Sequence, residues 1–324
     1  MRALLWRGEE GLAVVSCDPP ASRPGWALVA PSHVGLCGTD LHICAGTHPR
    51  ARAGLVIGHE FVGRLLDPVG PLSAGQAVFV NPLLPCGACA ACASGLRHAC
   101  ERLELLGIDR PGGAAEQALV PAGSLTALPD GLPLERAALI EPLAVAVRAV
   151  RRSGLMLSDD VHVVGAGPIG LLVALCARAA GAARVTVSEP SAERRRAAAE
   201  LGLEPCQPAP HGRRADVVFD STGNESAAPT LARWARTGGR IVVVGVHHGP
   251  VAVDLRSVTF DELTIIGSRV YTDDDVGAAI SLLASGSFPA EGVVSAIVDM
   301  GAAAEAVERM RAGLELKVLV RVEA

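Results

Sequence analysis

The sequence has few aromatic residues, almost no lysine and no run of like charges. Aromatic residues make up 3% of the 324 positions, so polar contacts rather than ring surfaces are expected to set specificity. Lys317 is the only lysine among 29 basic residues. A coding bias toward arginine is the simplest interpretation, and no function follows from it. The net charge of −5, spread along the chain, argues against nucleic acid or an anionic membrane as the main partner and favours a small molecule.

The N-terminus also lacks the long apolar core of an export signal, because Arg7, Glu9 and Glu10 interrupt it. We therefore expect a cytoplasmic protein. The most apolar stretch, starting at Val161, contains clustered glycines and a strand, turn and helix pattern, so it predicts a buried βα unit rather than a membrane span. The nine cysteines are then expected as thiols, and closely spaced ones as metal ligands rather than disulfides.

The length and the 50% hydrophobic content allow two domains. The first 140 or so residues contain short apolar runs broken by Gly and Pro, which predicts a folded β domain. From about Glu141 onward, strand and helix patterns alternate as far as residue 268. This alternation predicts a doubly wound parallel sheet with right-handed crossovers, an α/β fold. Two more helical patterns and a strand at 317–322 close the chain.

The segment "GAGPIG" fits the G-x-G-x-x-G motif and lies between a predicted strand and a predicted helix. Such glycines allow a tight turn and a close approach of backbone to a pyrophosphate at the helix N-terminus. Glu189 ends the next strand, where a carboxylate accepts from the adenine ribose hydroxyls and repels a 2′-phosphate, so NAD is preferred to NADP. Arg194 flanks the ribose or belongs to a solvated helix face. A turn without a ligand is the alternative for the glycines. The residues expected to contact the cofactor are Gly165, Gly167, Pro168, Ile169, Gly170, Glu189 and Arg194.

Four cysteines with the spacing C-x2-C-x2-C-x7-C lie in one loop, residues 85–100. Four thiolates suit a tetrahedral Zn²⁺, and a closed set of four ligands leaves no position for a substrate. We therefore expect a structural zinc; an iron–sulfur cluster and an unligated loop are the alternatives. The ligands are Cys86, Cys89, Cys92 and Cys100.

A second set of candidate ligands is scattered, in "CGTDLH", "GHE" and "EP". Taken singly, each residue would pass for an ordinary core side chain. Together, one thiolate, one imidazole and one or two carboxylates are the mixed set that a catalytic zinc with an open position requires. The candidates are Cys37, His59, Glu60 and Glu141.

These motifs, in this order and with the closing "KVLV", resemble the zinc-dependent medium-chain alcohol dehydrogenases over nearly the whole chain, most closely the polyol and threonine dehydrogenase branch. The resemblance implies a GroES-like catalytic domain at 1–142 with its structural zinc loop at 85–100, an NAD-binding Rossmann domain at 143–268, and a return segment at 269–324. It also implies two zinc ions per chain and a homodimer or homotetramer.

The resemblance further implies roles for individual residues. Zinc is held by Cys37, His59 and a carboxylate, and the choice between Glu60 and Glu141 stays open. Asp40 receives the other N–H of the zinc-bound histidine, Thr39 takes the proton of the alcohol, and His42 passes that proton to solvent.

The expected activity is hydride transfer between NAD and a small polar alcohol or ketone, the alcohol being a secondary alcohol of a polyol, sugar, cyclitol or amino alcohol. Three alternatives remain: a threonine-type dehydrogenase, a carbonyl reductase, and a non-catalytic protein that binds zinc and nucleotide.

Overall fold

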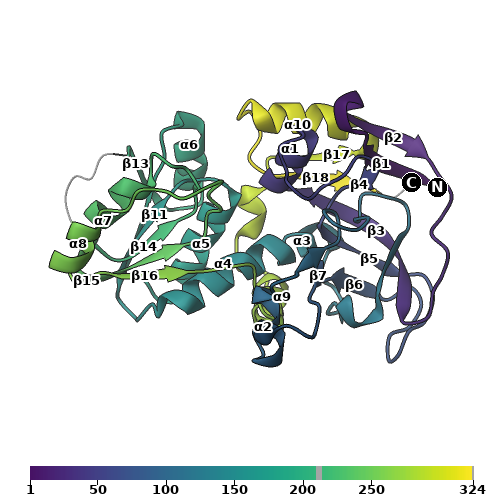
Figure 1. Ribbon diagram of the computed structural model, residues 1–324, viewed down its shortest axis with the longest axis horizontal. Helices are drawn as coiled ribbons and strands as arrows, with labels where there is room; N and C mark the ends of the chain where they lie inside the picture. Colours follow the sequence, from purple (N-terminus) through teal and green to yellow (C-terminus); the bar gives the residue numbers. More distant parts are fainter. Residues whose placement is uncertain (209–213, 323–324) are drawn as a thin grey trace. The chain divides into compact units, whose positions relative to one another are not determined.

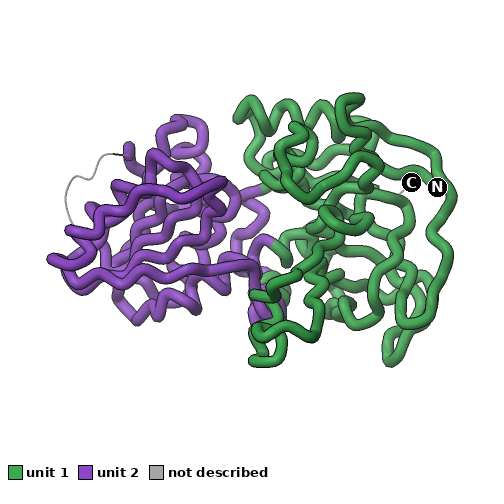
Figure 2. Tube along the Cα trace, viewed as in Figure 1, with its two compact units in different colours: residues 1–141, 280–285, 294–324 green, residues 142–279, 286–293 purple. Residues whose placement is uncertain are grey.

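The computed structural model describes residues 1–208 and 214–322. The chain forms two compact units (Figure 2). Unit 1 contains Met1–Glu141, Ile280–Ser285 and the described chain from Val294, and unit 2 contains Pro142–Ala279 and Gly286–Val293. Residues 269–279, expected in the return segment, thus belong to unit 2, so the chain returns to unit 1 later than the sequence indicates.

Unit 1 is built mainly from antiparallel strands, as its short, interrupted apolar runs predict (Figure 1). Its main sheet has the order β10-β6-β5-β3-β18-β17, with β9 also paired to β3. These strands are β3 (Trp26–Leu36), β5 (Glu60–Leu65), β6 (Ala77–Val80), β9 (Ala118–Pro121), β10 (Leu125–Ala127), β17 (Ala296–Asp299) and β18 (Val318–Arg321). Smaller sheets contain β1 (Arg2–Trp6), β2 (Leu12–Ser16) and β4 (Leu55–Val56), and β7 (Leu83–Leu84) with β8 (Glu104–Leu105).

Helices connect and cover these strands. Unit 1 has α1 (Gly38–Cys44), α2 (Ala90–Ala93), α3 (Leu134–Ala137) and α10 (Ala303–Arg311), while α4 (Ile140–Ser153) and α9 (Asp273–Ala284) continue from one unit into the other. Short 3-10 turns lie at Gly8–Glu10, Arg97–Ala99, Ala122–Ser124, Ala228–Thr230, Ala290–Val293 and Met300–Ala302. Among the described residues, no helix combines the length and the apolar character needed to cross a bilayer.

Unit 2 is a six-stranded parallel sheet in the order β13-β12-β11-β14-β15-β16. The strands are β11 (Asp160–Val164), β12 (Arg184–Ser188), β13 (Glu204–Cys206), β14 (Ala215–Asp220), β15 (Ala235–Val243) and β16 (Thr264–Gly267), and the helices between them are α5 (Pro168–Ala179), α6 (Ala192–Glu200), α7 (Leu231–Trp234) and α8 (Leu255–Phe260). The order reverses next to β11, the first strand. Doubly wound sheets bind their ligands at the carboxyl ends of the strands on either side of such a reversal.

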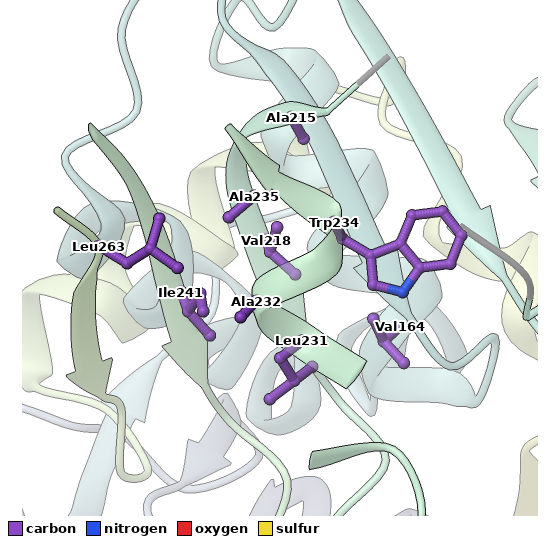
Figure 3. Close-up of a cluster of buried hydrophobic side chains, with 9 residues drawn as sticks. All are labelled: Val164, Ala215, Val218, Leu231, Ala232, Trp234, Ala235, Ile241 and Leu263. Carbon is purple, nitrogen blue, oxygen red and sulfur yellow. The ribbon is translucent and has the colours of Figure 1, made fainter. Parts of the chain in front are cut away.

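Apolar packing holds the sheet of unit 2 to its helices. All five residues of β11 are buried, as expected for a central parallel strand. On one face, side chains from β14, β15 and α7 form a continuous cluster (Figure 3). Trp234 at the end of α7 stacks on the His162 ring with 3.7 Å between the ring centroids. His162 Nδ1 and Nε2 are hydrogen-bonded to Thr186 Oγ1 at 2.7 Å and Ser188 Oγ at 3.0 Å, so this buried histidine has a structural role.

Candidate metal centres and cofactor site

Three of the four scattered candidate ligands converge in unit 1. Cys37 follows β3 directly, and His59 and Glu60 stand at the start of β5. Antiparallel pairing of β3 with β5 sets Gly35 opposite Glu60, which brings the two segments together. Ligand atoms of Cys37, His59 and Glu60 all lie within 4.8 Å of one another. One sulfur, one imidazole nitrogen and one carboxylate oxygen fit a zinc ion that keeps a position open.

Asp40 lies close to His59. Its Oδ2 accepts a 2.9 Å hydrogen bond from the Cys37 backbone N–H and lies 3.9 Å from His59 Nδ1. Burial lowers the pKa of His59, but Asp40 and Cys37 outweigh that effect, and the pKa lies well above its usual value. His59 Nδ1 and Asp40 Oδ1 are buried and lack hydrogen-bond partners among the described residues. A metal bound at the other ring nitrogen would draw the imidazole into a defined orientation, with Nδ1–H directed toward Asp40.

Glu60 is paired with the chain's only lysine, which sequence reasoning set aside as a compositional bias. Lys317 Nζ donates to Glu60 Oε2 and, at 2.9 Å, to the Leu36 carbonyl. The two side chains are only 2% and 1% exposed. Burial lowers the pKa of Lys317, but the negative charges of Glu60 and Cys37 outweigh burial. The pKa therefore lies above its usual value, and the ammonium stays charged.

Glu141 is buried in the first turn of α4 but is not one of the three clustered ligands. Its negative charge is one of the charges that raise the pKa of Lys317. The geometry therefore favours Glu60 over Glu141 as the direct ligand.

The two predicted proton-carrying residues lie on α1. Thr39 Oγ1 is 3.8 Å from Cys37 Sγ, so its hydroxyl stands beside the ligand cluster. His42, one helical turn further, is exposed, and its Nδ1 lies 3.3 Å from Thr47 Oγ1. The helix thus leads from the cluster to the surface within a single turn.

The four cysteines of the 85–100 loop form a second cluster within the same 4.8 Å limit. Cys89 begins α2 and accepts from the Cys92 backbone N–H at 3.5 Å, and Cys100 Sγ accepts from the Cys86 and Arg102 backbone N–H groups at 3.3 Å each. Hydrogen bonds of this kind stabilise thiolates, the form that binds metal. They hold the pKa of Cys86 at about 6, the Ala88 N–H being the largest cause.

Arg102 adds a contact that sequence reasoning missed. Its guanidinium donates to Cys86 Sγ at 3.6 Å. Burial, by contrast, raises the pKa of Cys92 to about 11, so without metal this cysteine is a thiol. Four sulfurs with backbone N–H support fit a structural zinc.

The glycine motif of unit 2 forms the turn between β11 and α5. Gly165 has φ of +99°, a conformation that disfavours other residues. A Cβ at Gly170 would overlap the Gly165 carbonyl oxygen, so this glycine allows the helix to lie close to the strand. Gly167 precedes α5, and Pro168 occupies its first turn, leaving the helix N-terminus facing the turn. The site fits a pyrophosphate.

Glu189 follows β12 and reaches back to this turn. Its Oε2 accepts from the Ala166 backbone N–H at 2.9 Å, and its Oε1 from the Ser191 N–H at 3.0 Å. Each carboxylate oxygen can accept a further bond, which leaves Glu189 able to bind ribose hydroxyls. Arg195 holds the adjacent backbone by donating to the Glu189 and Pro190 carbonyls at 2.7 and 2.6 Å. The contact of Arg194 with the ribose stays a prediction.

Known proteins resemble this chain in sequence and in fold. The family model described as alcohol dehydrogenase GroES-like domain matches residues 23–130, and the one described as zinc-binding dehydrogenase matches residues 168–285. The 2-dehydro-3-deoxy-L-galactonate 5-dehydrogenase of Pseudoalteromonas atlantica is 37% identical over 321 residues, covering 94% of each chain. The chain belongs to the zinc-dependent medium-chain alcohol dehydrogenases.

Two other members of this dehydrogenase family extend the comparison. The L-galactonate-5-dehydrogenase of Escherichia coli is 35% identical and covers 95% of each chain. A zinc-binding dehydrogenase of Sinorhizobium meliloti, solved with NADP, superposes with a TM-score of 0.92 at 29% identity, covering 99% of this chain and 98% of that one. At the level of the family, these matches confirm the predicted fold class, a zinc-dependent oxidoreductase acting on secondary alcohols, and zinc and NAD as cofactors.

Proposed function

We propose that this dehydrogenase oxidises a secondary hydroxyl of a polyhydroxylated acid or a closely related polyol. The clustering of Cys37, His59 and Glu60 beside Thr39 carries the proposal, because it combines metal ligands with a proton acceptor. The names of the two galactonate-type relatives support a sugar acid in particular. The aromatic content of 3% supports recognition by polar groups.

Each of the site residues in unit 1 has a separate role in this proposal. Zinc, when bound by Cys37, His59 and Glu60, would supply a Lewis acid toward the alcohol oxygen, and NAD would accept the hydride. Asp40 fixes the tautomer and orientation of His59. Thr39 Oγ would accept the hydroxyl proton while releasing its own, and His42, exposed on the same helix, would exchange the released proton with water.

Cofactor choice rests on Glu189 in this proposal. A carboxylate at the end of β12 is repelled by a 2′-phosphate, so NAD should be used in preference to NADP. The Sinorhizobium meliloti relative was solved with NADP, which makes the preference worth measuring directly. Substitution of Glu189 by Gln, which keeps the shape and removes the charge, should narrow the ratio of kcat/KM values for NAD and NADP.

A panel of substrates tests the function. NADH formation should be fastest with six-carbon aldonic acids, slower with neutral polyols and aminocyclitols, and slowest with simple alcohols. The Cys37→Ser variant should be inactive on every substrate. Oxidation of threonine alone would favour the threonine-type alternative, and faster reduction of the matching ketones would favour a reductase. The absence of turnover on all substrates, with zinc and NADH still bound, would favour a non-catalytic protein.

For assembly, we infer a homodimer or homotetramer in which two copies pair through β16. This strand is the last in the order of its sheet, and its Ile265 is 43% exposed. In the preceding helix α8, Phe260 is 74% exposed and adds apolar surface. An unpaired edge strand with apolar neighbours readily pairs with a second copy. Light scattering should give the mass of a dimer or a tetramer, and Ile265→Lys should shift it toward the monomer.

The cysteine chemistry favours a reducing compartment, in agreement with the expected cytoplasmic location. The described cysteines are all free thiols, and four of them form a metal-binding cluster. Oxidation of any of these four would remove a ligand.

A further inference from the structure

In unit 2, the carboxyl ends of the six strands form one row across the sheet. The paired residues run Cys206, Ser188, Val164, Asp220, Val243 and Gly267. Each is followed by a loop, and the loops after Ser188 and Val164 carry Glu189 and the glycine motif. The adenosine and pyrophosphate parts of NAD belong there. The other half of the dinucleotide therefore crosses the ends of β14, β15 and β16.

Those three strand ends carry polar side chains that the reaction scheme has not used. His247 Nε2 lies 3.0 Å from Asp220 Oδ2, and Asp220 is completely buried. The other carboxylate oxygen of Asp220 accepts from the Thr222 N–H at 3.0 Å and the Thr222 hydroxyl at 2.7 Å. Because an ionised carboxylate only accepts, Nε2 of a neutral His247 carries the proton and Nδ1 is left as an acceptor.

Two buried polar atoms here lack a hydrogen-bond partner within the described chain: His247 Nδ1 and Ser268 Oγ. They belong to the loops after β15 and β16, and the Ser268 N–H donates to the Val243 carbonyl at 2.9 Å, so these loops are neighbours. A buried acceptor or hydroxyl without a partner costs about 1–3 kcal/mol. His59 Nδ1 and Asp40 Oδ1 at the zinc cluster are unpartnered in the same way. At the zinc cluster, a bound metal would direct His59 Nδ1–H toward Asp40 and so supply that partner. For His247 Nδ1 and Ser268 Oγ, a ligand that reaches the loops after β15 and β16 would supply it.

The loop that carries His247 is firmly placed. The Val244 and Gly245 N–H groups both donate to the Asp220 carbonyl at 2.9 Å. A Cβ on Gly245 would overlap the backbone of Gly223, so the turn after β14 and the loop after β15 are in direct contact. The His247 side chain remains 12% exposed, so the ring reaches the surface at this edge of the sheet.

We propose that His247, oriented by Asp220, hydrogen-bonds the nicotinamide riboside half of NAD, with Ser268 as a second contact. His247 Nδ1 accepts from an amide N–H or a ribose hydroxyl of that half, and Ser268 Oγ supplies a neighbouring hydroxyl. Asp220 is a positioning residue, because it acts on the cofactor through His247. This assignment requires the dinucleotide but not the sugar-acid substrate proposed above, so the substrate panel can fail without affecting it.

The test compares two ligands that differ only in the part His247 contacts. Binding of NADH and of ADP, which lacks the nicotinamide riboside half, is measured by titration calorimetry on the zinc-loaded protein. His247→Ala should weaken NADH about tenfold, the loss of one good hydrogen bond, and leave ADP within about twofold of the wild type. His248→Ala, in the same loop with an exposed side chain, is the matched control and should leave both affinities unchanged.

Ser268→Ala provides an independent arm on a different loop. It should weaken NADH about threefold and spare ADP, even if His247→Ala does not fold. Equal weakening of NADH and ADP would overturn the proposal, because it would indicate damage to the whole cofactor site. Unchanged NADH affinity in both variants would overturn it as well.

Discussion

The two metal-binding clusters of unit 1 are built in opposite ways. The four-cysteine cluster takes all its ligands from one loop, and backbone N–H groups of the same loop support the sulfurs. The cluster of Cys37, His59 and Glu60 depends on strand pairing and is surrounded by charged residues, Asp40 from α1 and Lys317 from the end of the chain. A closed site needs only local backbone support. At a site with an open position, fewer protein ligands surround the metal. Neighbouring residues must therefore hold those ligands in place.

The largest expected effect is a loss of activity on changing the cluster of Cys37, His59 and Glu60, here called the open cluster. His59→Ala removes the imidazole that the metal and Asp40 share, so kcat/KM should fall at least about 10³-fold, as expected for the loss of several kcal/mol of Lewis-acid stabilisation. Because the cysteine loop is separate, the protein should keep one of the two zinc ions typical of the family. Kinetics measures kcat/KM, metal analysis measures the zinc content, and circular dichroism checks that the variant is folded.

Asp40→Asn serves as the graded comparison for His59→Ala. It keeps the shape beside His59 but removes the negative charge, so a loss of only about 10- to 100-fold is expected. If His59→Ala retained near-normal activity with only one zinc bound, the open cluster would not be the catalytic site.

Changing the four-cysteine cluster, here called the closed cluster, should lower the stability of the protein but not its catalytic activity. Cys100 is buried, and its sulfur accepts two backbone hydrogen bonds. Cys100→Ser should release the structural zinc and lower the melting temperature by roughly 10 °C. Turnover at low temperature should persist, because the other ligand set is intact.

Cys17→Ser is the matched control, since Cys17 is an exposed free cysteine outside both clusters. Its melting temperature and zinc content should equal those of the wild type. Complete loss of turnover in folded Cys100→Ser would mean that the two clusters are not independent.

The contrast between the clusters also explains what the sequence could predict. Ligands with short, regular spacing, such as Cys86 to Cys100, can be assigned without a structure because the loop itself brings them together. The glycine motif is equally local. Its partner Glu189 could be placed because parallel strands end at one edge of a sheet.

Contacts between distant segments escaped prediction. Lys317 meets Glu60 only because β18 pairs with β3 and β3 with β5. The contact of Arg102 with Cys86 and the pair of His247 with Asp220 likewise depend on how loops fold back. A signal for Lys317 was present nevertheless: one lysine among 29 basic residues marks a position where arginine does not fit.

This interpretation of Lys317 gives the smallest of the predicted effects. Lys317→Arg keeps the charge but places a larger, planar group in a site that is 2% exposed. Overpacking should lower the free energy of unfolding by about 1–3 kcal/mol, measured by urea denaturation of the zinc-loaded protein. Arg321→Lys makes the reverse exchange at an exposed position of β18, the strand that directly follows Lys317, and should change stability by less than about 0.5 kcal/mol.

Removing the pair in two steps separates charge from size. Lys317→Met should be more destabilising than Lys317→Arg, because it leaves the Glu60 carboxylate buried without a counter-ion. Adding Glu60→Gln should recover part of that loss, since the neutral amide no longer needs the ammonium. If Lys317→Arg were as stable as the wild type, the lone lysine would be an accident of composition. The contrast between a self-sufficient closed cluster and a charge-supported open one would then rest on Asp40 alone.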